Sequence, residues 1–204
     1  MQTYGHEDYQ IIEAERVFQG YFSINKLTIK HRLFDGNWSN SFQREIFERG
    51  NAAAVLLYDP DLQSVVLLEQ FRAGALASET SPWMLEVVAG IIEAGETPEG
   101  LVIREAEEEA GQKISELIKI GEFFTTPGGS TEKLWLFCAK VDASDAAGVF
   151  GLENEDEDIR TFTMNLDEAE KGLNNGLFEN ATSIIALQWL LLNREKVHSS
   201  WNKV

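Results

Sequence analysis

The chain of 204 residues has a formal net charge of -17 and lacks an obvious basic stretch, so we expect no nucleic-acid partner. Its 44% hydrophobic and 25% charged residues are typical of a globular protein of one large or two small domains. No apolar run is long enough to cross a bilayer, and the first residues do not resemble a signal peptide. The single cysteine, Cys138, excludes an internal disulfide, so the sequence predicts a cytoplasmic protein with no membrane partner.

The first fifty residues favour antiparallel strands. Apolar alternation predicts strands at 11–18, 24–34 and 42–49, and Asp35-Gly36 marks a tight turn between the last two. Three strands alone are marginally stable, so this sheet has to pack on something else. We expect a small antiparallel domain at 1–50 and a second domain at 51–204.

The second region alternates strands and helices. A hairpin is predicted at 52–59 and 64–72, followed by strands at 84–93, 116–124, 132–141 and 159–165. Helices are predicted at 97–110, 166–174 and 180–197; Thr97 caps the first, Gly111 ends it, and Asn180 or Thr182 caps the last. This order predicts a mixed sheet with helices on its faces, an α/β or α+β fold.

Four glutamates crowd the end of the first predicted helix, in the stretch REAEEEAG. Glu105, Glu108 and Glu109 are three and four positions apart, so they share one helical face and repel one another. Mg²⁺ is commonly held by one or two carboxylates together with substrate phosphates. The cluster therefore indicates either a metal site, in which Arg104 pairs with Glu108 one turn on, or a solvated acidic face.

Seven positions around this helix match the order G-x5-E-x7-R-E-x-x-E-E-x-G, which resembles the signature of the Nudix hydrolases. They are Gly90, Glu96, Arg104, Glu105, Glu108, Glu109 and Gly111. One position departs from the pattern, since Gln112 stands where the family usually has an aliphatic residue. Segments from GYFS to ATSIIALQWL resemble the bacterial ADP-ribose pyrophosphatases over almost the whole chain. The resemblance implies a Nudix α/β/α sandwich after a small antiparallel β domain, and a homodimer whose exchanged N-terminal domains help to build the partner's active site.

The resemblance also implies hydrolysis of ADP-ribose to AMP and ribose 5-phosphate, with two or three Mg²⁺ ions per site and Mn²⁺ as a substitute. It places metal ligands at Glu105, Glu109 and the Ala89 carbonyl. Glu108 would be a further ligand or a carboxylate braced by Arg104, and Glu157 a metal or substrate contact. Glu96 would orient the helix or a metal-bound water. The catalytic base is expected in the acidic loop 151–158, at Glu155, with Glu153 as a nearby competitor.

Substrate contacts are implied at positions outside the helix. They are Tyr21, Phe22, Arg44, Glu45, Arg49, Arg72, Ile91, Thr126, Pro127, Gly128 and Glu132. Strands also carry arginines and aromatics for ordinary structural reasons, so each assignment has a purely structural alternative. Two other functions stay open: hydrolysis of another nucleoside diphosphate sugar such as GDP-mannose, and a non-catalytic ADP-ribose sensor. The complete set of motif carboxylates disfavours the sensor.

Overall fold

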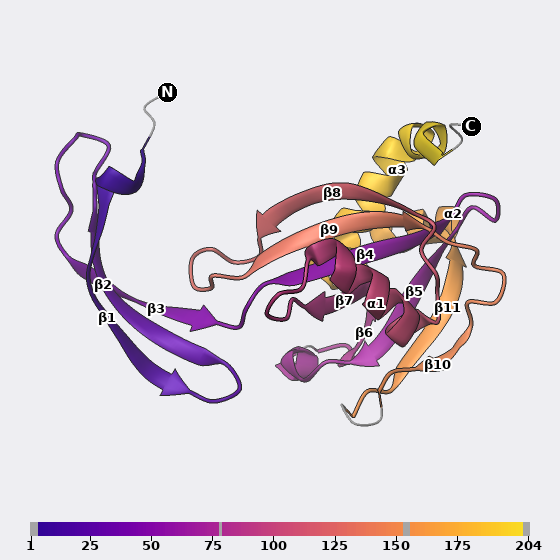
Figure 1. The fold of residues 1–204 in the computed structure, drawn as a ribbon, viewed down its shortest axis with the longest axis horizontal. Helices are drawn as coiled ribbons and strands as arrows, with labels where there is room; N and C mark the ends of the chain where they lie inside the picture. Colours follow the sequence, from indigo (N-terminus) through magenta and orange to yellow (C-terminus); the bar gives the residue numbers. More distant parts are fainter. Residues whose placement is uncertain (1–3, 78, 153–155, 202–204) are drawn as a thin grey trace. The chain divides into compact units, whose positions relative to one another are not determined.

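The computed structural model describes residues 4–77, 79–152 and 156–201, and the chain divides into two compact units (Figure 1). The first unit consists of Met1–Asn51 together with Phe124–Lys133, and the second of Ala52–Phe123 with Leu134–Val204. The loop at 124–133, which we expected in the second domain, thus groups with the first unit. Its Gly129 carbonyl accepts a hydrogen bond of 2.8 Å from the Phe47 amide.

The first unit is a three-stranded antiparallel sheet in the order β1-β2-β3. A short 3₁₀ helix (η1, His6–Asp8) precedes β1 (Tyr9–Gln19), β2 (Ser23–His31) and β3 (Phe42–Glu48). The second strand ends three residues earlier than expected, because the chain turns back where the Leu33 amide donates to the Asn37 carbonyl. Every residue of β1 is exposed, including Ile11 and Phe18, each 56% exposed. This strand therefore presents apolar side chains that no described residue covers.

The second unit contains a mixed sheet in the order β10-β11-β5-β4-β9-β8, with β6 paired to β5 and β7 paired to β4. Its strands are β4 (Ala52–Asp59), β5 (Ser64–Phe71), β6 (Trp83–Glu86), β7 (Val88–Ile91), β8 (Glu116–Phe124), β9 (Lys133–Lys140), β10 (Gly148–Phe150) and β11 (Ile159–Asn165). Its helices are η2 (Ala73–Ala77), α1 (Pro98–Ala110), α2 (Leu166–Asn174) and α3 (Ala181–Trp201). The pairs of β4 with β5 and β7 are antiparallel and its pair with β9 is parallel, so the expected mixed sheet is confirmed.

The prediction of a single strand at 84–93 is wrong. The segment forms two strands, because β6 pairs with β5 and β7 pairs with β4. Val87 stands between the two strands, and its amide donates to the hydroxyl of Ser183 at 3.1 Å. A side chain of α3 thus satisfies the backbone amide at the point where the chain passes from β6, beside β5, to β7, beside β4. The three-residue strand β10 was not expected either.

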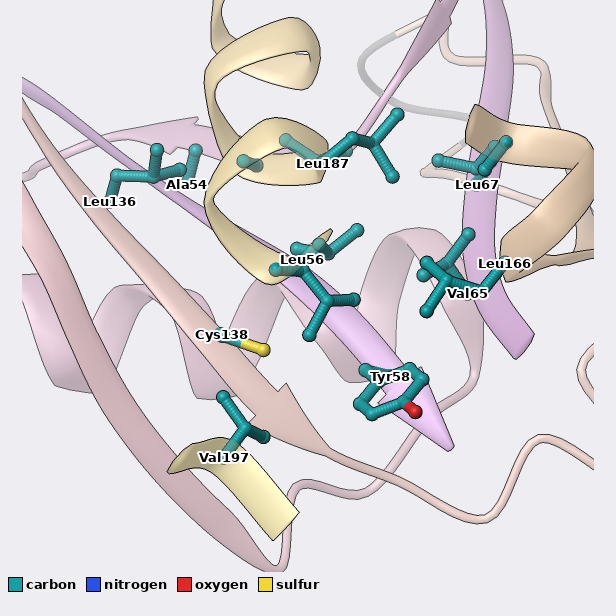
Figure 2. Close-up of a cluster of buried hydrophobic side chains, with 14 of the residues drawn as sticks. Ala54, Leu56, Tyr58, Val65, Leu67, Leu136, Cys138, Leu166, Leu187 and Val197 are labelled. Carbon is teal, nitrogen blue, oxygen red and sulfur yellow. The ribbon is translucent and has the colours of Figure 1, made fainter. Parts of the chain in front are cut away.

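Helices cover both faces of this sheet, and β4 lies buried between them. Ala54, Leu56 and Tyr58 belong to the cluster that contains Leu187 and Val197 of α3 (Figure 2). The intervening residues of β4 pack with α1 instead. A strand buried on both faces needs a continuous apolar run, which the stretch AAAVLLY supplies.

The ends of α1 follow the expected caps. The Thr97 hydroxyl accepts a 3.0 Å bond from the Gly100 amide, and Gly111 has a φ of 62°, which disfavours a side chain. At α3, Asn180 is the cap: its Oδ1 accepts from the amides of Thr182 and Ser183. In the described part of the chain, no helix has the length and apolarity needed to cross a membrane.

Candidate active site

Two glutamates of α1 lie against the chain at β7. The Ala89 amide donates to Glu109 Oε2 at 3.2 Å, and Glu109 is only 3% exposed. A Cβ atom at Gly90 would overlap the carboxylate of Glu105, with 2.8 Å to its Cδ. Glycine at this position therefore lets backbone and carboxylate approach closely. The Thr161 hydroxyl donates to the Glu109 carbonyl at 2.9 Å and ties the end of α1 to β11.

Burial dominates the electrostatics of these two side chains. It raises the pKa of Glu109 to about 8 and, more weakly, the pKa of Glu105 to about 7. The charge of Glu105 adds to the raised pKa of Glu109, and the charge of Glu157 raises both. Glu157 thus lies close enough to act on both carboxyls, and its Oε2 accepts a 3.3 Å bond from the Leu152 amide. The structure brings these three predicted residues into one electrostatic group.

Arg104 is the cation of this helix face. Its Nη1 contacts Glu108 Oε2 at 2.7 Å and Glu105 Oε1 at 3.0 Å, and its Nε donates to Glu96 at 3.1 Å. The pair of Arg104 with Glu108, expected from their spacing, is present. The bond to Glu96 is the main reason that the pKa of Arg104 is raised and the pKa of Glu96 is lowered. Arg104 therefore links the predicted motif glutamate to the helix.

The donor chemistry fits a hard divalent cation. Glu109 is a buried carboxylate that accepts a hydrogen bond from one backbone amide, and such a buried charge is costly without a cation. Its neighbours supply oxygen atoms, which Mg²⁺ prefers. Over residues 4–77, 79–152 and 156–201, no three Asp, Glu, His or Cys side chains are grouped as a metal site would group them. Arg104 instead contacts two of the carboxylates, so ion binding would require them to turn away from it.

Sequence reasoning missed Glu86, the buried partner of Arg72, and a second buried polar residue, Gln70. Arg72 Nε donates to Glu86 Oε2 at 2.7 Å, and Asn180 Nδ2 donates to Glu86 Oε1 at 2.5 Å. Glu86 and Gln70 are each at least nine-tenths buried. Both are polar residues in apolar strands. This contrast is the feature of the sequence from which their special role could have been predicted. In the described structure, Gln70 Nε2 has no hydrogen-bond partner.

Another set of predicted substrate residues meets within the first unit. Arg49 Nη1 contacts Glu132 Oε1 at 3.0 Å, and the Arg49 guanidinium lies 5.7 Å from the centre of the Phe22 ring. Tyr21 packs edge-on against Phe22 and is 87% exposed. The structure therefore joins Phe22, Arg49 and Glu132, which are distant in sequence.

The remaining predicted positions are less tightly connected. Arg44 and Glu45 are exposed neighbours on β3, and Arg44 stacks on Phe42 at 4.6 Å. Thr126, Pro127 and Gly128 are exposed in the loop, and Ile91 is half-buried at the end of β7. The predicted base Glu155 and its competitor Glu153 lie outside the described residues.

Comparisons with known proteins show the family of this chain. The model of the NUDIX domain matches residues 48–185. The ADP-ribose pyrophosphatase of Escherichia coli K12 is 42% identical over 199 residues, which cover 98% of this chain and 95% of the relative. The enzyme of the same name from Haemophilus influenzae is 37% identical over 206 residues, covering 100% of this chain and 95% of the relative.

A relative with another name and a solved structure also resemble this chain. A GDP-mannose pyrophosphatase of Cronobacter sakazakii is 35% identical over 188 residues, with 90% of this chain and 95% of the relative covered. A crystal structure of an ADP compounds hydrolase superposes with a TM-score of 0.70 at 18% identity, covering 99% of this chain and 100% of that one. The second likeness confirms the expected fold. The resemblance seen in the motif is likewise confirmed, and the chain belongs to the Nudix family.

Proposed function

We propose that this protein is a Mg²⁺-dependent hydrolase that splits the diphosphate of ADP-ribose into AMP and ribose 5-phosphate. The observation that carries the proposal is the pair of half-buried Glu105 and buried Glu109 beside the Ala89–Gly90 backbone, both with a raised pKa. Support for the substrate comes from the names of the relatives that are 42% and 37% identical.

The proposed mechanism assigns separate roles to the metal ligands, the phosphate-binding arginine and the catalytic base. Glu105, Glu109 and the Ala89 carbonyl would hold Mg²⁺, with Glu108 and Glu157 as further oxygen donors. Bound there, Mg²⁺ would neutralise the charge of the diphosphate and lower the pKa of an attacking water; two or three ions are proposed. Arg72 would bind a phosphate oxygen. The proposed base, Glu155, would accept the proton of the water, in a loop that carries several other acids.

The decisive experiment is a substrate panel. Purified protein would be incubated with ADP-ribose, GDP-mannose and NADH, with Mg²⁺ or with EDTA, and the products separated by chromatography. We expect AMP and ribose 5-phosphate from ADP-ribose, with the highest kcat/KM of the panel and no turnover in EDTA. Binding of ADP-ribose without products would contradict the proposal and favour a sensor.

GDP-mannose is the second candidate substrate, because a relative of that name is 35% identical over 90% of this chain. The same carboxylates would serve its diphosphate equally well, since they do not contact the base or the sugar. A higher kcat/KM for GDP-mannose in the panel would therefore change the substrate and keep the mechanism.

We further propose a homodimer in which each N-terminal unit contributes to the site of the partner. The exposed apolar side chains of β1 support it, since a three-stranded sheet with such a strand needs a covering surface. A second copy of this chain is the simplest occupant, because most soluble oligomers are symmetric homo-oligomers. The free, buried Cys138 is consistent with a cytoplasmic location.

Complementation between inactive variants tests the shared site. Arg44→Ala and Glu105→Gln would be made separately and then co-expressed in one cell. If each site takes Arg44 from one subunit and Glu105 from the other, half of the dimers are mixed and one of their two sites is intact. We then expect about a quarter of the wild-type activity. Co-expressed protein no more active than the separate variants would place both residues in one subunit, and a monomer by light scattering would exclude the dimer.

A further inference from the structure

The side chain of Glu86 forms a buried bridge between Arg72 and the start of α3. One carboxylate oxygen accepts from Arg72 Nε at 2.7 Å and the other from Asn180 Nδ2 at 2.5 Å. The Glu86 side chain is only 7% exposed, whereas that of Arg72 is 45% exposed. A buried carboxylate needs such partners, because its desolvation is costly without them. The bridge therefore fixes the base of an arginine whose tip remains accessible.

Asn180 anchors the bridge from the other side. Its Oδ1 caps α3 by accepting from two amides, at 2.9 Å and 3.2 Å, while its Nδ2 donates to Glu86. Both ends of this amide are thus in use, and the start of a 21-residue helix holds the orientation of Glu86. The hydroxyl of Ser183 adds a separate bond to the Val87 amide, next to the bridge but not part of it.

The position of Arg72 explains why it needs to be held. Arg72 is bonded to Glu86, and Glu86 stands three residues before Ala89, whose amide donates to Glu109 Oε2 at 3.2 Å, so the guanidinium lies near the proposed metal carboxylate. An unrestrained arginine there would tend to pair with Glu109 and compete with a cation for it. The bond to Glu86 uses Nε, the nitrogen nearest the chain. Among the described residues the two Nη groups at the tip have no hydrogen-bond partner, so they can bind an anion.

We propose that Glu86 and Asn180 are positioning residues that aim the tip of Arg72 at the diphosphate and keep it from the metal carboxylates. This inference rests on the proposed function, in which Arg72 binds a phosphate oxygen. Neither Glu86 nor Asn180 contacts the substrate; they act through Arg72. Their loss is therefore expected to weaken substrate binding more than it slows the chemical step.

A double-mutant cycle tests the inference. Glu86→Gln keeps the size of the side chain but replaces one acceptor oxygen and the negative charge. We expect it to raise KM for ADP-ribose about tenfold, with kcat changed less than threefold. The same change in an Arg72→Ala background should alter KM less than twofold, because the residue that Glu86 positions is then absent. Binding of an ADP-ribose analogue with a methylene group between the phosphorus atoms should weaken in the same pattern.

Two variants at the start of α3 separate positioning from stability. Asn180→Ser keeps a capping oxygen but cannot reach Glu86, so KM should rise as in Glu86→Gln. Ser183→Ala removes the neighbouring bond to Val87 and should lower the melting temperature without changing KM. Asn180→Ser also serves as the test if Glu86→Gln fails to fold.

The outcomes distinguish the bridge from the function on which it rests. If Arg72→Ala alone leaves KM unchanged, the proposed contact of Arg72 with the diphosphate is wrong. If Arg72→Ala raises KM but Glu86→Gln does not, or if the two effects add fully, Arg72 binds substrate without help from the bridge. Only a rise in KM that disappears in the Arg72→Ala background supports the positioning role.

Discussion

Replacing Glu105 by glutamine is expected to lower kcat/KM for ADP-ribose about a thousandfold or more, or roughly 4 kcal/mol of transition-state stabilisation. Glu105 lies on the buried face of α1 against Gly90 and shares its electrostatic environment with Glu109 and Glu157. The amide of glutamine has nearly the same shape but supplies a weaker, neutral oxygen. A hard cation would therefore lose a charged ligand while the packing is kept.

Glu107→Gln is the matched control. Glu107 belongs to the same acidic run but is exposed, and it is two positions from Glu105, so it points to another side of the helix. Glu107→Gln removes one negative charge, as Glu105→Gln does, and should change kcat/KM less than twofold. Titration calorimetry with Mn²⁺ gives a readout that is independent of turnover: Glu105→Gln should weaken ion binding and Glu107→Gln should not. Equal losses in the two variants would mean that total charge, rather than ligation, sets the activity.

The sequence predicted the helix and its acidic face because their signals are local. A proline at the first position, a threonine cap and a terminal glycine define α1, and the spacing of three and four residues places the carboxylates together. The sequence also indicated the partner of Arg104, since Glu108 lies one turn away. These features depend on residues within about fifteen positions of one another, as the cap of α1 and the contacts of Arg104 with Glu96 and Glu108 show.

The features that sequence reasoning missed join distant segments. The break between β6 and β7 depends on which neighbour each half pairs with, and an apolar run gives no information on that choice. Glu86 meets Arg72 from 14 positions away and Asn180 from 94 positions away. Such bridges follow from the path of the chain between β6 and α3. Polar residues within apolar strands were the one local sign that these positions have a specific partner.

The metal-free protein is expected to lose stability as the pH rises from about 5.5 to 8.5, and Mg²⁺ is expected to restore it. Glu105 and Glu109 have folded-state pKa values of about 7 and about 8, above the ordinary value of 4.5. The folded state therefore binds more protons than the unfolded state between pH 4.5 and 8. Stability from these groups is fully present below pH 4.5 and is lost as the pH rises through 7 and 8. A loss of the order of 3 kcal/mol would lower the melting temperature by roughly 6–12 °C.

Mg²⁺ binds the deprotonated carboxylates, so its effect should have the opposite pH dependence. We expect millimolar Mg²⁺ to change the melting temperature little at pH 5.5 and to raise it by several degrees at pH 8.5. Glu109→Gln removes the most strongly shifted carboxyl, so without metal it should be more stable than wild type at pH 8.5 and should respond less to Mg²⁺. Glu107→Gln should melt like wild type in both respects. Because protons and Mg²⁺ compete for the same two side chains, a Mg²⁺ response that is equal at both pH values would mean that Glu105 and Glu109 do not form the metal site.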